Sequence, residues 1–258
     1  MSAFSAAAWR AMAIVLVVFL LAPIVLLMIF SFTSRGLTNF PIEGLSLRWW
    51  GEMIHHKQFW PAFLNSMIIG ASVGLISAIV GTMAAMGLVS LAPKRATLAM
   101  SVLTLPVMLP PLVLAVALLS FFVSIGLKLG LATVIISHVL FTQPFVILIV
   151  HARMATFDYR IVESARDLGA SPLTAFLTVT LPIIRPIVIG AALIAMALSI
   201  DDFVITVFTI GSGNTLPTLV WGMIRTGLTP AVNAIGTLIL LLTIGSSLIA
   251  LRLTQYRG

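Results

Sequence analysis

The sequence predicts an all-α polytopic membrane protein with six transmembrane helices and one helical loop on the cytoplasmic side. Hydrophobic residues make up 60% of the 258 residues and charged residues only 8%, whereas about 25% of the residues of a soluble domain are charged. Six apolar stretches reach the roughly 20 residues that a helix needs to cross a bilayer. These stretches are 11–32, 63–90, 98–124, 131–151, 186–209 and 233–251, and we expect one transmembrane domain over 1–258.

The first two predicted spans each have a feature that bears on their role. The stretch 11–32 is too long for a signal-peptide core and lacks an obvious small-x-small cleavage site, so we expect it to be a retained span. The stretch 63–90 contains Gly70, Gly74 and Gly81, and such spacing lets helix backbones approach closely. The contact could lie within this chain or at a subunit interface, and the sequence does not separate the two.

Charged connections separate the later spans. The pair Lys94-Arg95 precedes 98–124, and Lys128 precedes 131–151. The span 131–151 contains His138, which either joins two helices by a hydrogen bond or lines a solute path. An outer segment rich in Gly, Pro and Thr connects the last two spans, 186–209 and 233–251.

The distribution of cations predicts that both termini are cytoplasmic. Six spans place the termini on one side, and cytoplasmic loops carry an excess of Lys and Arg. With the termini inside, nine cations are internal and five are external, so the net charge of +7 reflects orientation and not nucleic-acid binding. The inner set is Arg10, Lys94, Arg95, Arg153, Arg160, Arg166, Arg185, Arg252 and Arg257, and the outer set is Arg35, Arg48, Lys57, Lys128 and Arg225.

The largest inner loop, 152–185, has the pattern of a helix, a glycine and a second helix. Asp158 is a candidate cap for the first helix, and Gly169 is a candidate left-handed stop at its end. Ser171 with Pro172 is a favoured start for the second helix. We expect Pro182 and Pro186 to close this loop segment. Because the loop carries an apolar stripe, it is expected to bind a groove on a partner protein.

The loop resembles the "EAA" loop of the membrane-spanning subunits of binding-protein-dependent ABC importers. That pattern is Glu-Ala-Ala, three residues, Gly, nine residues, Ile, one residue and Leu-Pro; here Ser164 replaces Ala and Val179 replaces Ile at conserved spacing. The resemblance implies a type I importer permease fold in which this loop is the coupling helix that contacts an ATPase subunit. The implied coupling residues are Glu163, Ala165, Asp167, Gly169, Leu181 and Pro182.

Most of the chain is similar to the polyamine (spermidine/putrescine) group of these permeases. The similar segments include "SLRWWGEM", "SHVLFTQPF" and the C-terminal third from "LSIDDFV" onward. Members often have Pro-Asp or Pro-Glu in the third span, where this chain has Pro110-Pro111. The resemblance implies import of putrescine, spermidine or a related small cation across the bacterial inner membrane. Relatives that handle opines or phosphonates provide an alternative substrate class.

The resemblance also implies partners and cofactors. The partners are a cytoplasmic ATPase dimer, a second and homologous permease subunit that forms a heterodimer with this one, and an extracytoplasmic substrate-binding protein. No G-x-x-x-x-G-K-[ST] segment is present in the chain. We therefore expect no cofactor here, with ATP and Mg²⁺ bound by the ATPase, and no catalytic or metal site.

The pair Asp201-Asp202 is the most unusual feature of the spans. A charge at membrane depth costs about 3 kcal/mol, so such residues usually face an interior or a wet cavity. Adjacent helical residues point about 100° apart. We therefore expect one carboxylate to face the solute path and the other to cap a broken helix or to pair with a neighbour. His138 is the third candidate residue of the path.

Two other classes of function remain open from the residues alone. An ion-coupled secondary transporter would use the Asp pair as its ion site and would need no ATPase. A purely structural membrane subunit would tolerate neutralisation of both acids. The spacing of the loop motif favours the importer permease over both.

Overall fold

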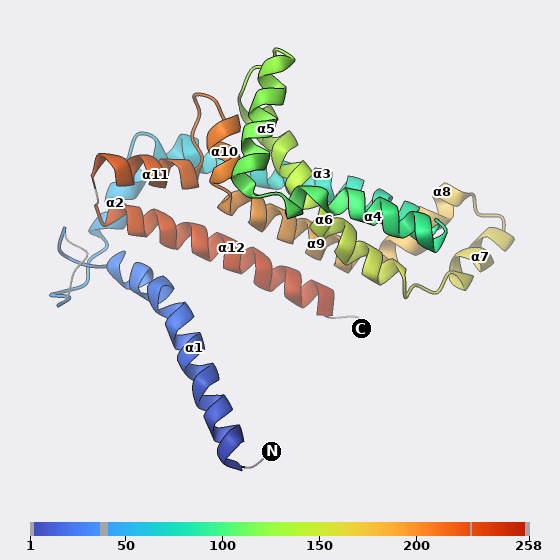
Figure 1. Cartoon of the computed structure of the whole chain (residues 1–258), viewed down its shortest axis with the longest axis horizontal. Coiled ribbons are helices and arrows are strands. Elements are labelled where there is room, and N and C mark those ends of the chain that lie inside the picture. The colour runs from blue at the N-terminus through green and yellow to red at the C-terminus, as the bar shows by residue number, and fades with distance from the viewer. Residues whose placement is uncertain (1–2, 37–40, 228, 256–258) are drawn as a thin grey trace. The chain divides into compact units, whose positions relative to one another are not determined.

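The computed structural model describes residues 3–36, 41–227 and 229–255, and these are helical apart from short connections (Figure 1). An isolated antiparallel bridge joins Thr33 and Leu45. The α-helices are α1 (Ala3–Phe30), α2 (Arg48–His55), α3 (Phe59–Val89), α4 (Pro93–Met108), α5 (Pro111–Ser124), α6 (Leu131–Met154), α7 (Arg160–Asp167), α8 (Pro172–Ala175), α9 (Leu181–Asp201), α10 (Val204–Thr209), α11 (Leu216–Thr226) and α12 (Ala231–Gln255).

Five helical segments are long and apolar enough to cross a membrane, and a bent pair brings the number to six if it is counted as one span. The five segments are Ala8–Phe30, Phe59–Val89, Leu131–Met154, Pro172–Asp201 and Ala231–Leu253. An all-helical, multi-span protein was predicted from the sequence, and the structure has this architecture.

The predicted span 98–124 is not one straight helix. It consists of α4 and α5, which meet at an angle of 96° (Figure 1). The bend lies at Leu109 and Pro110, whose ψ angles of 139° and 133° are extended. Proline disfavours the helical conformation of the residue before it, and the sequence Leu-Pro-Pro applies that constraint twice.

The prediction that Pro182 and Pro186 end the loop was wrong, because helical structure runs from Pro172 to Asp201. A π-helix, Phe176–Thr180, lies directly before α9, and the amide of Leu181 donates to the carbonyl of Phe176. Proline lacks an amide hydrogen and clashes with the carbonyl four residues earlier. The wider π turn accommodates that conflict just before Pro182. The fifth span therefore begins inside the predicted loop 152–185.

The predicted span 186–209 also ends earlier than expected. The helix α9 stops at Asp201, and the next residue is extended, with φ −69° and ψ 126°. The remaining residues of the predicted span form the short helix α10. No helix breaker such as Gly or Pro occurs at this position, so the place of the break is a structural finding.

Contacts group the chain into two compact units, and the prediction of one transmembrane domain stays a prediction. The first unit contains the described residues up to Trp60 together with Leu219–Leu240. In it α1 packs on α12 at Gly236, where an added Cβ would lie 3.3 Å from a methyl group of Leu27. The Trp49 indole donates to the carbonyl of Thr33 at 2.8 Å, which fixes α2 beside the end of α1.

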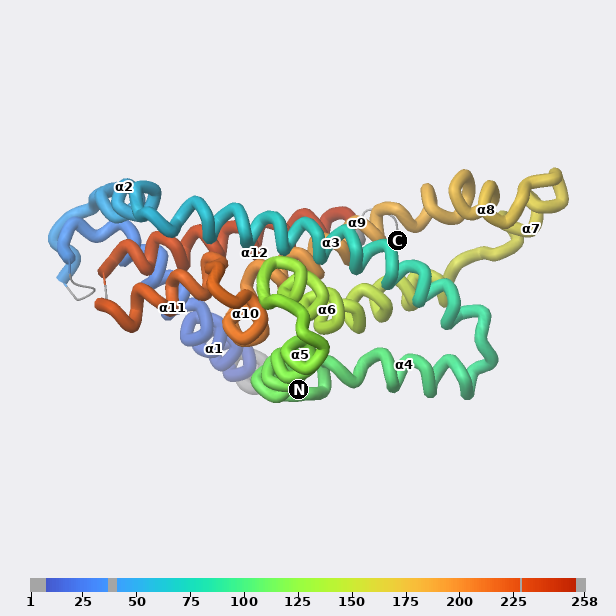
Figure 2. The backbone as a smooth tube through the Cα atoms, turned by 90° about the horizontal axis from the view of Figure 1, so that it is seen from above, coloured from blue at the N-terminus to red at the C-terminus, as the bar shows by residue number. Residues whose placement is uncertain are grey.

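The second unit contains Pro61–Thr218 and the described residues from Leu241 onward. Its core is formed where α3, α6 and α9 run side by side (Figure 2). Gly70 and Gly74 lie against α9, and Gly81 lies against α6. These three glycines therefore serve helix packing within the chain, one of the two possibilities that the sequence left open.

Gly81 provides a test of this packing. An added Cβ at Gly81 would lie 2.5 Å from Cγ1 of the buried Val146, a β-branched side chain with little rotamer freedom. Gly81→Ala should lower the free energy of unfolding by about 1–3 kcal/mol, measured by equilibrium unfolding in mixed micelles. The control is Gly87→Ala on the same helix, where nothing lies within 4 Å of an added Cβ. Equal stability of the two variants would contradict the close approach of α3 and α6.

Candidate functional site

The centre of the candidate site is the break between α9 and α10. Where α9 stops, the first amides of α10 lose helical partners, and unsatisfied backbone groups are costly within a bilayer. The carboxylate of Asp202 replaces one of these partners, because its Oδ2 accepts a hydrogen bond from the Thr206 amide at 2.9 Å. The Thr206 hydroxyl lies 3.1 Å from the Asp202 carbonyl and 3.2 Å from the same Oδ2. Asp202 thus caps a broken helix.

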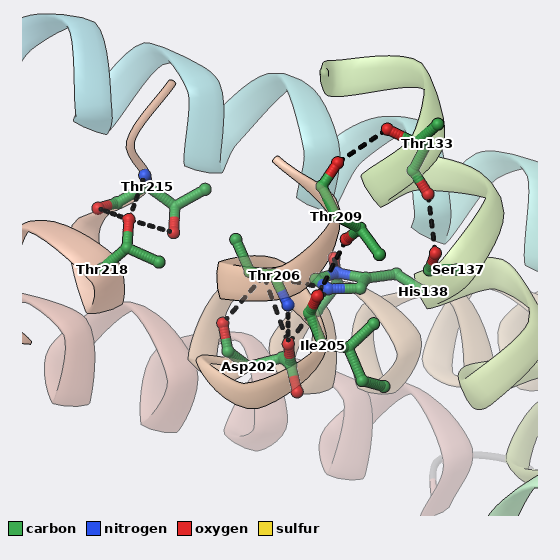
Figure 3. Close-up of polar contacts among 10 residues, drawn as sticks. Thr133, Ser137, His138, Asp202, Ile205, Thr206, Thr209, Thr215 and Thr218 are labelled. Atoms are coloured by element: carbon green, nitrogen blue, oxygen red, sulfur yellow. Dashed lines mark hydrogen bonds and ion pairs between the residues drawn. The ribbon is translucent and has the colours of Figure 1, made fainter. Parts of the chain in front are cut away.

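His138 fixes this break to α6. Its Nε2 lies 3.2 Å from Asp202 Oδ2 and 3.1 Å from the Thr206 hydroxyl (Figure 3). Its Nδ1 lies 2.8 Å from the Ser199 hydroxyl. The imidazole is 1% exposed. Both ring nitrogens are therefore occupied by groups of α9, α10 and the residue between them. In this structure His138 is a buried histidine that joins helices.

Asp201 has the opposite environment. Its side chain is exposed, and it forms no hydrogen bond or ion pair with the described residues of its own unit. The side chain of Asp202 is only 11% exposed. The two adjacent carboxylates are therefore separated by environment, with one held inside the protein and one free to meet another molecule.

Further polar contacts hold the segments around the break. The Thr133 hydroxyl donates to the carbonyl of Thr209 at 2.7 Å, which ties the end of α10 to the start of α6 (Figure 3). The Asn65 amide donates to the carbonyl of Asn214 at 2.8 Å, and the amide of Leu216 donates to the Ser66 hydroxyl at 2.9 Å. These contacts fix both the break and the segment that follows α10 to α3 and α6.

Sequence reasoning missed Ser199, Thr206 and Thr133. Thr206 had a usable signal, since it follows Asp202 by four residues, the spacing of neighbours on one helical face. Ser199 and Thr133 had none, because Ser and Thr are common in apolar helices and their partners come from other elements. Among the described residues, no group of three or more His, Asp or Glu side chains is placed to bind a metal ion.

The loop has the helix–glycine–helix geometry expected of it. The Asp158 carboxylate accepts from the Arg160 amide at 3.1 Å at the start of α7, and Gly169 has the left-handed φ of 92°. The Ser171 hydroxyl accepts from the Thr174 amide at 3.1 Å and caps α8. Leu168, directly before the glycine, is 90% exposed.

The predicted coupling residues do not all lie together. Glu163, Asp167 and Gly169 are exposed around the turn between α7 and α8, and Ala165 is half-buried on α7. Leu181 and Pro182 lie in the first turn of α9, beyond the π-helix. The predicted site residues thus form two groups. The coupling residues lie near the start of the helical run Pro172–Asp201, and Asp201, Asp202 and His138 lie at its end.

A multi-span helical bundle with an exposed helix–glycine–helix loop at one end and a buried polar junction at the other defines a membrane permease subunit. Residues 77–256 match the family described as "Binding-protein-dependent transport system inner membrane component". The chain belongs to this family. Family membership sets aside the alternatives of an ion-coupled secondary transporter and a purely structural subunit.

The chain is similar to curated permeases over most of its length. It is 36% identical to the putrescine transport system permease protein PotI of Escherichia coli K12, over 90% of this chain and 85% of that protein. It is 31% identical to the spermidine/putrescine transport system permease protein PotC of Shigella flexneri, over 93% of this chain and 92% of that protein.

Solved transporters share the fold. A bacterial ABC transporter that imports the acidic polysaccharide alginate matches with a TM-score of 0.71 at 14% identity, covering 96% of this chain and 95% of that one. The inward-facing MetNI methionine ABC transporter matches with a TM-score of 0.60 at 18% identity, covering 77% of this chain and 97% of that one. In another structure the alginate transporter is in complex with a periplasmic protein bound to an alginate pentasaccharide.

The different environments of the two carboxylates lead to a stability test. Asp202→Ala removes the cap of α10 and leaves His138 without its acidic partner, so the free energy of unfolding should fall by about 2–4 kcal/mol. Asp201→Ala should change it by no more than about 0.5 kcal/mol, because the side chain is exposed and unpaired. Equilibrium unfolding in mixed micelles measures both. A double variant with His138→Ala should lose less than the sum of its parts; full additivity would contradict the pairing of His138 with Asp202.

Proposed function

We propose that this chain is the permease subunit of an ATP-driven importer of polyamines or related small cations, and that Asp201 presents its carboxylate to the solute. The observation that carries the proposal is the exposed, unpaired carboxylate of Asp201 beside the sequestered carboxylate of Asp202. The names of the PotI and PotC relatives support the same substrate class.

The carboxylate of Asp201 favours a cationic solute. An ionised carboxylate is costly at membrane depth, so one that has no partner within the protein is expected to bind a partner from outside it. An ammonium group supplies that partner, whereas a fixed negative charge repels the anionic phosphonates. Pro110-Pro111 stands where members of the polyamine group often have an acid, so Asp201 is the principal acid of our proposed path. Asp202 and His138 border the path and hold the helix break that positions Asp201.

The mechanism that we propose is alternating access driven by a separate ATPase dimer, which binds ATP and Mg²⁺. The exposed turn with Glu163, Asp167 and Gly169, together with Ala165, contacts the ATPase. Leu168 supplies an apolar anchor, since its nearly complete exposure leaves a large hydrophobic side chain uncovered by the described residues. Leu181 and Pro182 connect the loop to α9.

We further propose the arrangement of the complex in the membrane. Both termini lie in the cytoplasm, as the nine inner cations against five outer ones favour. A second, homologous permease completes the path as a heterodimer. A substrate-binding protein delivers the solute at the outer face, close to the C-terminal end of α9.

The role of Asp201 is tested by transport. Asp201→Asn should raise the KM for putrescine uptake about tenfold or more, because it removes a charge-assisted contact. Uptake is measured in proteoliposomes that contain the complete importer. Glu52→Gln is the matched control, since Glu52 is an exposed carboxylate on α2. Asp201→Asn with the KM of the wild type would refute the substrate role.

The role of the loop is tested by a pair of glycines that share a left-handed backbone. Gly169→Ala and Gly126→Ala introduce similar local strain of about 1–2 kcal/mol at φ angles of 92° and 70°, and neither added Cβ meets an atom within 4 Å. Only Gly169→Ala should lower the ATPase stimulation that accompanies uptake. Equal loss in both variants would mean that strain alone, and not ATPase contact, explains the effect.

A further inference from the structure

An apolar groove of about 440 Å³ lies between α3 and α9, away from the break at Asp202. Leu75, Ile79 and Met83 line it from α3, and Leu181, Ile189 and Ala192 line it from α9. Its volume is within the range of about 300–1,000 Å³ that small-molecule sites occupy. No residue that lines it belongs to the two groups of site residues except Leu181.

The groove begins where the two helices cease to touch. At Gly74 an added Cβ would lie 3.0 Å from the Ala192 carbonyl oxygen, so the backbones are in close contact there. On the loop side of this contact the π-helix contributes Phe176 to the far end of the groove. On the opposite side both helices pack on α6 through the core that includes Ala85, Val146 and Ala191. The groove therefore opens on the side of this three-helix core that faces away from α6.

The lining accepts hydrocarbon and offers no polar anchor. Thr82 is the one polar residue among those that line the groove, and its hydroxyl oxygen is shielded from solvent. Three of the lining side chains, Leu75, Ile79 and Met83, are more than half exposed and would contact whatever fills the groove.

A single cation lies on the same face of α9. Arg185 follows Leu181 by four residues and precedes Ile189 by four, so all three share one face of the helix. Arg185 is exposed and forms no ion pair with the described residues of its unit. Because helical side chains lean towards the N-terminus, Arg185 directs its guanidinium towards the level of Leu181, in the half of the groove that is nearer the loop.

We propose that this groove binds an anionic phospholipid from the leaflet on the loop side, with its phosphate on Arg185 and an acyl chain between α3 and α9. Only the assignment of that leaflet as cytoplasmic rests on the proposed orientation. From Leu181 to Ala192 the helix rises about 16 Å, close to half of the roughly 30 Å hydrocarbon core. The part of the groove from Leu181 to Ala192 therefore has about the length of one leaflet, with the cation towards its headgroup end and Phe176 beyond it on the loop side.

A second copy of this chain fits the groove less well. A helix packed there would bury Arg185, and a buried charge needs an acidic partner. The acids of the whole chain are Glu43, Glu52, Asp158, Glu163, Asp167, Asp201 and Asp202. The only ones in a candidate span or beside it are the last two, and they lie at the opposite end of α9 from Arg185. A lipid phosphate supplies the missing negative charge directly.

Native mass spectrometry of the purified full-length chain with added phosphatidylglycerol or phosphatidylcholine tests the proposal. The wild type should retain phosphatidylglycerol preferentially, and Arg185→Gln should reduce that preference about fivefold. Arg185→Lys should keep the preference, and Arg95→Gln, an exposed cation on α4 outside the groove, should not change it. Equal phosphatidylglycerol retention by wild type and Arg185→Gln would overturn the proposal. Because no transport is measured, the result is independent of the test of Asp201.

The occupant of the groove can be identified separately, because the chain contains no cysteine. Ile79→Cys places one thiol in the groove, and the side chain that it replaces is 54% exposed. In membranes this variant, carrying a bimane label, should be quenched by brominated phosphatidylglycerol more than by brominated phosphatidylcholine, and the difference should disappear with Arg185→Gln. A disulfide-linked dimer of unlabelled Ile79→Cys would show that a second copy covers the groove, and would overturn the lipid assignment.

Discussion

The capping of a helix break inside the membrane is the constraint on which the rest of the site depends. A bilayer offers no water to the amides that are freed when α9 ends, so the protein itself must supply acceptors. Asp202 does so with the carboxylate that binds the Thr206 amide. His138, from α6, gives the same carboxylate a second polar partner. The break is thus stabilised by a satisfied polar network, which is favourable in a low-dielectric interior only when every member has a partner. Asp201 gains its exposure from this arrangement, because the chain turns away from the helix directly after it.

Proline has two different effects in this chain, and the difference explains which helix boundaries could be predicted. At Leu109 and Pro110 successive prolines force extended backbone and a bend of 96°. At Pro182 the helix continues, because the preceding π turn relieves the clash that an ordinary α turn would produce. Both sites contain Leu followed by Pro within apolar sequence, but only the first has a second proline directly after it. The surrounding structure differs as well. The segment after Pro182 packs along α6, with Ile184 fully buried, and this packing stabilises the continued helix.

The sequence predicted the class of fold and the helix–glycine–helix loop because both depend on local patterns. Apolar length, Gly169 and Ser171 with Pro172 act within a few residues, and each has the geometry expected of it. The division of labour between the carboxylates was predicted only as a pair of alternatives. Its assignment needed a contact across 64 residues, from His138 to Asp202, which no local pattern contains. The same applies to Ser199, whose hydroxyl matters only because α6 places an imidazole beside it.

A continuous helical path connects the two groups of site residues. From Pro172 to Asp201 the run is 30 residues long, or about 45 Å, and its first turns lie beside α7 while its last residue precedes the break. A helix transmits displacement along its axis, since its hydrogen bonds keep its length fixed. The π-helix and Pro186 are the two points at which this path could bend, whereas the contacts of Gly70 and Gly74 hold its C-terminal half against α3. The helical run thus joins the loop to the Asp202–His138 junction without any direct contact between the two.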